Sequence, residues 1–303
     1  MKRGKTGAAA LSVASNSLLI ALKIAAGAIT GSIAIITEAA HSAVDLIASV
    51  IALVSVRKAD EPPDPEHPYG HEKVENLAAA IEGMLILVGA GIIVYEATRR
   101  LVVGAHVENI GVGIAVIGFS AVANLFVSRF LQRRADEERS AALEADAAHL
   151  RTDVLTSVGV LAGLALVQVT GNAVFDPITA LVVAGVIVFA GLRILTGSSR
   201  VLVDEAPPPE ELDRIEAAIA GARPPEMVGY HKLRARRAGA RSYIDLHVQF
   251  RSGTTLEDAH ALAHRLRAAI EAEIQGSEVL IHVEPEGAVR SPAARDKAPY
   301  RAG

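Results

Sequence analysis

The sequence predicts an α-helical membrane protein, in which six transmembrane helices precede a small α/β open-faced sandwich of element order αββαβ. Three observations lead to this fold class. Of the 303 residues, 51% are hydrophobic, and the mean hydropathy of +0.34 is high for a soluble protein. The long apolar runs fall almost entirely within residues 8–203. Residues 204–303 have the charge and apolar spacing of an ordinary soluble domain followed by a tail.

Six apolar segments are each long enough to cross a bilayer, which takes about 20 helical residues. They are residues 8–29, 33–56, 74–98, 110–131, 141–169 and 177–199. Turn-forming residues separate several of these segments. They are Thr30-Gly31-Ser32 after the first segment, the proline-rich residues 61–65 after the second, and Gly171-Asn172 with Asp176-Pro177 between the last two. An even number of spans places both termini on the same side of the membrane.

Lysine and arginine predict which side that is, because they concentrate in cytoplasmic segments. If the N-terminus is cytoplasmic, only Arg99 and Arg100 fall in outside segments. The basic residues that fall inside are then Lys2, Arg3, Lys5, Arg57, Lys58, Lys73, Arg133, Arg134, Arg139 and Arg200. We therefore expect a multi-pass protein of the inner (plasma) membrane with both termini in the cytoplasm.

Three domains follow from this pattern: a transmembrane domain at residues 1–203, a cytoplasmic domain at 204–286 and a disordered tail at 287–303. In the cytoplasmic domain the sequence predicts helices at 209–221 and 259–275 and strands at 227–237, 241–250 and 279–284. The middle strand alternates most clearly, because every second residue from 244 to 250 is apolar and the residues between them are polar or aromatic. That alternation predicts one buried and one polar face.

Several absences exclude whole classes of function. The chain has no cysteine, which rules out disulfides, iron–sulfur clusters and thiolate zinc sites. Three methionines are too few to suggest a site for monovalent copper. There is no P-loop for ATP and no HExxH helix of a zinc hydrolase. The net charge is −4 and no basic stripe carries interleaved aromatics, so we expect no nucleic-acid partner.

Two identical pairs of ionisable residues lie inside the predicted spans. His41 and Asp45 are four residues apart in the second span, and His149 and Asp153 repeat the spacing in the fifth. On a helix this spacing puts both side chains on one face, about 6 Å apart at Cβ. Each pair is predicted near the midplane, with each aspartate ~18 Å along its span at 1.5 Å per residue. Ionisable residues at that depth are costly and mark functional sites.

Together the four side chains would form a tetrahedral site of two nitrogens and two oxygens, which suits zinc and other first-row divalent ions. Two carboxylates and two neutral imidazoles neutralise a dication. When the ion leaves, the carboxylates share a low-dielectric pocket and the imidazoles become proton acceptors. Metal and protons therefore compete for the same atoms, which predicts metal/proton exchange.

Other roles for the intramembrane charges stay open at this point. Each pair could form a separate hydrogen bond between helices. Arg151 lies about 200° around the helix from the ligand face, so a structural or interfacial role is favoured. Glu38 near the outer face and Glu82 in the third span could line an ion path, or could pack and hydrogen-bond within the bundle.

Two further groups of ligand-type residues lie outside the spans. Residues 64–71 contain Asp64, His67 and His71, and the prolines with Gly70 bend the chain enough for a short loop to wrap an ion. In the cytoplasmic domain, histidines and one acid form a possible cluster: His231, His247, His260, His282 and Glu284. His282 and Glu284 are two residues apart on a strand and share a face. A solvated loop and incidental histidines are the alternatives to these two sites.

These motifs together resemble the cation diffusion facilitator family, and most of all its bacterial zinc exporters, over residues 8 to about 285. The resemblance rests on Thr30-Gly31-Ser32 before the second span, the two His-x-x-x-Asp pairs, the loop His67-x-x-x-His71 with Asp64, and His282-x-Glu284-Pro285 at the last strand. It implies a homodimer with packed C-terminal domains, protons as counter-substrate, and zinc both as cargo and as a structural or regulatory ion.

The resemblance also implies roles for individual residues. The transport site would be His41, Asp45, His149 and Asp153, and the loop site Asp64, His67 and His71. A binuclear cytoplasmic site would use His231, His247, His260 and His282, with Glu284 as the bridging carboxylate where the bacterial pattern has aspartate. A salt bridge at the membrane–cytoplasm junction would join Lys73 and Asp204.

The sequence thus predicts a secondary transporter, not an enzyme, that exports Zn²⁺ or a similar divalent ion from the cytoplasm by proton antiport. A histidine as first ligand of the transport site is similar to the zinc-preferring members, and imidazole is a softer ligand than carboxylate. Alternatives are the same transporter with Fe²⁺, Co²⁺, Ni²⁺ or Cd²⁺ as its main cargo, a membrane metal sensor that works through its C-terminal histidines, or an intramembrane metalloenzyme.

Overall fold

The computed structural model describes residues 3–30, 33–103 and 111–288 of the chain. Residues 31 and 32 of the predicted Thr30-Gly31-Ser32 break, and residues 289–303 of the predicted tail, lie outside the described residues. The chain divides into two compact units, Met1–Arg200 and Val201–Gly303. Each unit is considered by itself below.

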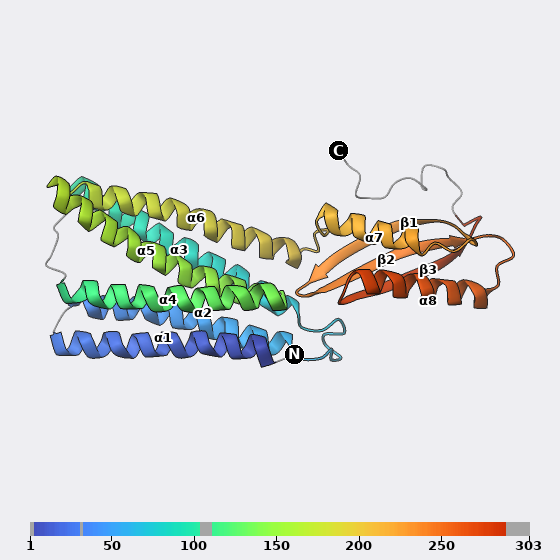
Figure 1. Cartoon of the computed structure of the whole chain (residues 1–303), viewed down its shortest axis with the longest axis horizontal. Coiled ribbons are helices and arrows are strands. Elements are labelled where there is room, and N and C mark those ends of the chain that lie inside the picture. Colours follow the sequence, from blue (N-terminus) through green and yellow to red (C-terminus); the bar gives the residue numbers. More distant parts are fainter. Residues whose placement is uncertain (1–2, 31–32, 104–110, 289–303) are drawn as a thin grey trace. The chain divides into compact units, whose positions relative to one another are not determined.

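The first unit is a bundle of six helices, which confirms the predicted six (Figure 1). They are α1 (Arg3–Thr30), α2 (Ile33–Ala59), α3 (Lys73–Val103), α4 (Gly111–Glu138), α5 (Ala141–Thr170) and α6 (Phe175–Leu202). By length and apolar composition, all of these except α2 could cross a membrane. Several side chains in the first turns of α2 are outside the described set, but α2 has 27 residues and packs between α1 and α3.

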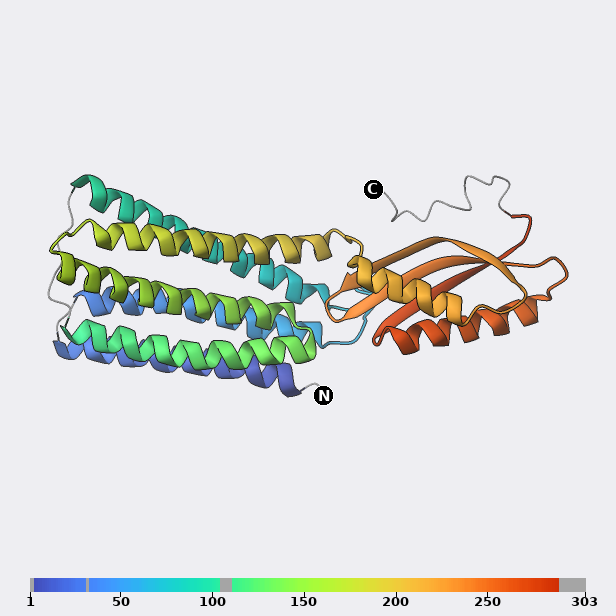
Figure 2. The same cartoon turned by 45° about the horizontal axis from the view of Figure 1, so that its top comes forward.

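Small residues let the helices of the bundle approach closely, as is usual in membrane proteins. A buried cluster at one end joins α1, α2, α4 and α5 through Ala8, Ala9, Val56, Leu131, Ala135, Ala142, Leu143, Ala147 and Leu150. Gly191 of α6 lies against α3, because a Cβ at this position would stand 3.0 Å from the Leu87 side chain. The turned view in Figure 2 shows α3 and α6 crossing at this side of the bundle.

Local signals in the sequence explain where α5 begins and ends. Ser140 is its N-cap and accepts a hydrogen bond from the Leu143 backbone N–H. At the other end Gly171 has a left-handed backbone (φ 72°), and its N–H closes the helix on the Val167 carbonyl. Ser140 Oγ also donates to Glu75 of α3, and Lys5 Nζ of α1 donates to the same carboxylate at 2.8 Å. The starts of α1, α3 and α5 are therefore tied together at one end.

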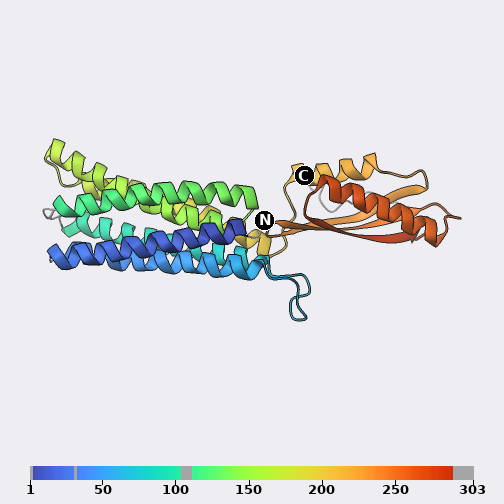
Figure 3. The same ribbon diagram turned by 60° about the horizontal axis from the view of Figure 1, so that its bottom comes forward.

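The second unit has the predicted order αββαβ: α7 (Pro209–Gly221), β1 (Met227–Ala238), β2 (Arg241–Phe250), α8 (Leu256–Glu273) and β3 (Ser277–Pro285). The sheet order is β1-β2-β3, with β1 antiparallel and β3 parallel to β2. Both helices cover the same face of the sheet, as the view in Figure 3 shows for α8.

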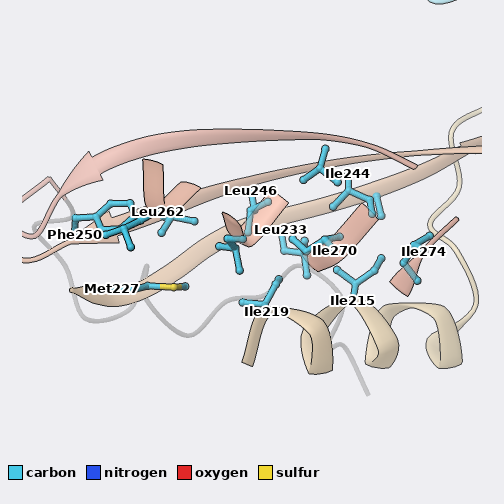
Figure 4. Close-up of a cluster of buried hydrophobic side chains, with 14 of the residues drawn as sticks. Ile215, Ile219, Met227, Leu233, Ile244, Leu246, Phe250, Leu262, Ile270 and Ile274 are labelled. Atoms are coloured by element: carbon cyan, nitrogen blue, oxygen red, sulfur yellow. The ribbon is translucent and has the colours of Figure 1, made fainter. Parts of the chain in front are cut away.

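The core of this unit lies between that face and the helices (Figure 4). Ile215 and Ile219 of α7 and Leu262, Leu266 and Ile270 of α8 meet the apolar face of β2. That face consists of the alternating residues predicted from the sequence, Ile244, Leu246, Val248 and Phe250, all of them buried. Burying each such side chain stabilises the fold by roughly 1.5–3 kcal/mol. Among the described residues of this unit no helix covers the opposite face of the sheet, and His247 lies on that face.

Candidate metal centres

The first candidate centre lies inside the helix bundle, where α2 and α5 pack together. His41 and Asp45 project from α2, and His149 and Asp153 project from α5. His149 Nε2 lies 3.2 Å from Asp45 Oδ1, across 104 residues of sequence. His41, Asp45 and Asp153 each offer a ligand atom, and these atoms all lie within 4.8 Å of one another. The structure therefore brings together all four residues predicted from the two His-x-x-x-Asp pairs.

Burial and unsatisfied atoms give this centre the character of a ligand cage. Asp45 and His149 are buried, Asp153 is half-buried, and His41 is exposed on the side of α2. Among the described residues, His149 Nδ1 and Asp153 Oδ2 are buried and have no hydrogen-bond partner. Buried polar atoms normally have a partner. Two nitrogens and two carboxylates with free lone pairs are the donor set that a tetrahedral divalent ion takes.

Polar side chains around the cage hold it in place. Thr152 Oγ1 donates to the His149 carbonyl at 2.7 Å, and Ser157 Oγ donates to the Asp153 carbonyl at 2.8 Å. On α1, Asn16 Nδ2 donates to the Asp45 carbonyl at 3.4 Å and to Ser49 Oγ at 2.7 Å. These hydrogen bonds fix the backbone that carries three of the four ligands.

The sequence analysis missed one charged group beside the cage. Lys23, in the last third of α1, is buried and its Nζ lies 2.6 Å from Ser42 Oγ and 2.9 Å from Glu38 Oε1. Ser42 follows the ligand His41 directly. The signal was available, since a lysine within an apolar span is as unusual as an aspartate there.

The second candidate centre is the loop between α2 and α3. Asp64 Oδ1 accepts hydrogen bonds from the backbone N–H groups of His67 at 2.6 Å and Glu66 at 3.0 Å. Gly70, at φ 89°, turns the chain so that His71 comes back toward Asp64. The hydrogen bond from the His67 backbone holds the pKa of the Asp64 carboxyl below its usual value. The carboxylate is therefore ionised and oriented.

His71 completes this loop centre in an unusual way. Its side chain is 1% exposed and its Nε2 lies 3.2 Å from Asp64 Oδ2. The approach lacks the angles of a hydrogen bond, so neither ring nitrogen has a hydrogen-bond partner among the described residues. Ligand atoms of Asp64, His67 and His71 lie within 4.8 Å of one another. The three residues predicted from the loop are thus close enough to hold one ion.

The third candidate centre lies on the open face of the sheet. His231, His247 and His282 stand at the same register on β1, β2 and β3. The ring centroids are 5.1 Å apart for His231 and His247 and 4.6 Å apart for His247 and His282. The chain leaves the β1 ladder directly after His231, at a bulge where Lys232 has φ 51°. Three imidazoles therefore form a row across the three strands.

Glu284 lies two residues beyond His282 and bonds to two members of this row. Its Oε2 is 2.8 Å from His231 Nε2, and its Oε1 is 2.6 Å from His247 Nδ1. Burial raises the pKa of the Glu284 carboxyl, but the hydrogen bonds from His247 and His231 outweigh burial and leave this pKa below its usual value. A carboxylate that joins two imidazoles is suited to bridge ions, as the resemblance implied.

Two predictions concern residues outside these three candidate centres. His260 is exposed on α8, with its ring 4.4 Å from that of His264, and it joins no ligand group within the described part of a single chain. Its membership of the C-terminal site stays a prediction. Lys73 belongs to the first unit and Asp204 to the second, so their salt bridge also stays a prediction. Within the second unit, Asp204 Oδ1 accepts from Arg236 Nη1 at 3.1 Å.

Comparison with known proteins covers both units. Residues 9–203 match the family model of the cation efflux transmembrane domain, and residues 207–286 match that of the cation efflux protein cytoplasmic domain. An uncharacterized transporter of Synechocystis sp. is 35% identical over 91% of this chain and 89% of its own length. The cation-efflux pump FieF of Yersinia pestis is 33% identical over 92% of both chains. Metal tolerance protein C1 of Arabidopsis thaliana is 34% identical over 87% of this chain and 59% of its own.

Two solved structures are similar to the C-terminal part alone. A structure of CzrB in its Zn form is 39% identical and covers 29% of this chain and 99% of its own, with a TM-score of 0.28. The metal-bound C-terminal domain of the CzcD transporter from Thermotoga maritima is 31% identical and covers 26% and 92%, with a TM-score of 0.25. The two family matches and the full-length relatives show that the chain belongs to the cation diffusion facilitator family of membrane-embedded cation efflux transporters.

Proposed function

We propose that this transporter exports a divalent cation, with Zn²⁺ as the favoured cargo, from the cytoplasm in exchange for protons. The observation that carries the proposal is the convergence of His41, Asp45, His149 and Asp153 between two helices of the bundle. The ligands come from α2 and α5, so a relative movement of these helices changes the access to the ion and its coordination.

The donor set supports zinc as cargo. Two imidazoles and two carboxylates provide borderline and hard ligands in the number that zinc takes, and the chain has no cysteine for softer ions. The same set also binds Fe²⁺, Co²⁺, Ni²⁺ and Cd²⁺, and affinity order alone does not fix the cargo. These ions are the alternative cargoes, and competition between them in the transport assay below separates the cases.

Proton coupling follows from the charges of the cage. A dication is neutralised by Asp45 and Asp153, and when it leaves, two carboxylates remain in a buried site. Protons on the imidazoles or carboxylates restore neutrality, and His149 Nε2 is 3.2 Å from Asp45 Oδ1, within reach of a shared proton. Each ion bound at these atoms therefore displaces protons from them.

We infer the remaining features from the distribution of charge and from the two family domains. The basic residues favour an orientation in the inner membrane with both termini in the cytoplasm, and the C-terminal unit matches a cytoplasmic domain of cation efflux proteins. In our proposal the chain works as a homodimer. The loop centre and the row of histidines around Glu284 then hold structural or regulatory zinc on the cytoplasmic side.

One alternative has its own supporting observation. The C-terminal centre is already preorganised, with Glu284 bonded to His231 and His247, and such a centre could serve a membrane metal sensor in which the bundle transports nothing. A sensor of this kind keeps its function when a bundle ligand is removed.

Vesicle transport tests the proposal. The purified full chain, reconstituted in vesicles with a pH gradient, should accumulate Zn²⁺ and should move protons in the opposite direction. Asp153→Ala should abolish both fluxes, because the cage loses one of its two negative charges. Glu96→Gln, at a half-buried residue paired with Arg99 and Arg100, is the matched control and should transport normally. Full transport by Asp153→Ala would remove the cage from the mechanism.

A further inference from the structure

A second acidic pair is buried in the bundle outside the four proposed ligands. Glu82 of α3 and Asp146 of α5 are both 0% exposed. Both carboxylate oxygens of Glu82 and Oδ2 of Asp146 have no hydrogen-bond partner among the described residues. Three orphaned carboxylate oxygens in one bundle interior are exceptional, because buried polar atoms nearly always have a partner.

The charged groups around the pair include no lysine or arginine that balances Glu82 among the described residues. The one charged group that acts on Glu82 among the described residues is Asp146. Asp146 is influenced in turn by His149 and Asp45, two of the proposed ligands, and Ser49 Oγ donates to its Oδ1 at 3.1 Å. Glu82 forms no salt bridge with a lysine or arginine in the described part of the chain, although the helix carries Lys73 and Arg100 toward its ends.

Electrostatics then decides the protonation of the pair. Two buried carboxylates that interact electrostatically cannot both be ionised in a low-dielectric interior without a cation, since each unpaired buried charge costs several kcal/mol. Glu82 and Asp146 are also absent from the groups of ligand atoms that could surround a metal in the described residues. A proton is the remaining ligand for the pair, because protonation removes the charge of a buried carboxylate and turns one of its oxygens into a hydrogen-bond donor.

A line of polar side chains connects this pair with the metal cage. Asp146 precedes His149 by three residues on α5, ~4.5 Å along the helix axis. Ser49 Oγ, which donates to Asp146, also accepts from Asn16 Nδ2 at 2.7 Å and lies 3.0 Å from Ser12 Oγ. Asn16 in turn donates to the carbonyl of Asp45. The surrounding side chains of the buried cluster at this end of the bundle are apolar.

We propose that Glu82 and Asp146 form a proton-holding carboxyl pair that exchanges protons with the metal cage. When the ion binds, the ionised carboxylate of the pair accepts the proton that leaves the cage and then releases it to the cytoplasm, and a proton from the outside reloads the cage after the ion has left. Only N–H and O–H bonds form and break in this step, and no other reactant is needed. The inference rests on the proposed function, because it assigns the path of the antiported proton.

Two fluxes in reconstituted vesicles separate a proton path from a structural role. Zn²⁺ driven by a pH gradient requires net proton movement, whereas exchange of Zn²⁺ for labelled Zn²⁺ at equal pH requires none. Glu82→Gln keeps the size and polarity of the side chain but cannot carry a proton. We expect the gradient-driven flux to fall about tenfold or more, as for loss of a proton-transfer group, while Zn²⁺/Zn²⁺ exchange is retained.

Glu96→Gln is the control for a carboxylate-to-amide change on the same helix, and neither flux should change.

A second measurement detects the proton directly. Infrared spectra of the wild type at neutral pH should contain a band of a protonated carboxyl group that is missing in Glu82→Gln. Asp146→Asn should remove or shift the same band, which keeps the test available if one variant does not fold.

The outcomes separate this inference from the proposed function. If the wild type couples Zn²⁺ to protons and Glu82→Gln retains the full gradient-driven flux, the carboxyl pair is not on the proton path. An equal loss of both fluxes, or a protonated-carboxyl band unaffected by both variants, also overturns it. If the wild type moves Zn²⁺ without protons, the proposed antiport itself fails, whatever Glu82 does.

Discussion

The bundle centre and the C-terminal centre use the same residue types and are built in opposite ways. In the bundle, ligands come from two helices, and His149 and Asp45 meet across 104 residues of sequence. On the sheet, His231, His247 and His282 lie at one register of adjacent strands, so backbone hydrogen bonds fix their spacing. Helices can slide and tilt as units, whereas a strand register cannot shift without breaking its ladder.

The two centres also differ in how their atoms are satisfied. Glu284 is bonded to two imidazoles before any ion is considered, whereas His149 Nδ1 and Asp153 Oδ2 have no hydrogen-bond partner among the described residues. A satisfied, rigid site is suited to holding an ion, and an unsatisfied site between movable helices is suited to exchanging one for protons. In our proposal cargo exchange therefore belongs to the bundle, and retention or sensing belongs to the sheet.

The largest expected effect comes from changing the bundle alone. Asp45→Ala removes one of the two carboxylates of the cage and should abolish Zn²⁺ transport in vesicles. Because the sheet belongs to the other compact unit, Zn²⁺ bound at the C-terminal centre should remain, as measured by calorimetry on the full chain. Loss of Zn²⁺ binding at the C-terminal centre in the same variant would contradict the separate roles of the bundle and the sheet.

The reverse change should affect binding more than transport. Glu284→Gln removes the negative charge that holds His231 and His247 together. The affinity of the C-terminal centre for Zn²⁺ should fall at least about tenfold, the range seen when supporting groups of metal sites are changed. Transport at saturating Zn²⁺ should persist. A complete loss of transport would show that the sheet takes part in the exchange itself.

The pH dependence of stability tests the C-terminal centre through its carboxylate, Glu284. The folded-state pKa of Glu284 lies below its usual value. The carboxylate therefore contributes stability that is fully present above the unfolded pKa, near 4.3, and is lost as the pH falls through the folded value. Thermal unfolding of the full chain with a chelator should show a steeper acid loss in the wild type than in Glu284→Gln. Identical acid profiles would contradict the assigned hydrogen bonds.

The smallest expected effect concerns a helix cap that belongs to none of the three candidate centres. Thr255 caps α8 and accepts from the Asp258 backbone N–H at 3.1 Å. Thr255→Ala should lower the unfolding free energy of the C-terminal unit by about 1 kcal/mol, and Thr255→Ser should restore it. Denaturant unfolding followed by a probe in this unit measures the difference. A change in transport would show that stability of the sheet limits the bundle.

The helices and the cage could be predicted from the sequence because their signals are local. Apolar length fixed the six spans to within several residues, although α4 continues to Glu138, beyond the predicted residue 131, since its polar end is also helix-forming. The four ligands followed from two i, i+4 pairs, each on one helix face. Strand alternation likewise predicted which side chains of β2 form the core.

Features that depend on neighbours across the fold could not be predicted in this way. No local pattern pairs Glu82 with Asp146, because their electrostatic interaction depends on how α3 packs against α5. The network of Asn16, Ser49 and Asp146 has the same origin, and Lys23 was missed although its position in an apolar span marked it. His260 was grouped with the other histidines as a possible cluster, and the structure places it on α8 rather than in the row of histidines on the sheet, so its membership stays a prediction.

X-ray absorption by the bound ion tests the central claim most directly. In a full chain carrying His71→Ala and Glu284→Ala, which weaken the loop and C-terminal centres, one Zn²⁺ should bind per chain. Its coordination shell should contain two imidazole nitrogens and two carboxylate oxygens, and Asp153→Ala should remove the binding. A bound Zn²⁺ with the same shell in the Asp153→Ala chain, or with no imidazole in the parent chain, would contradict the assignment of the cage.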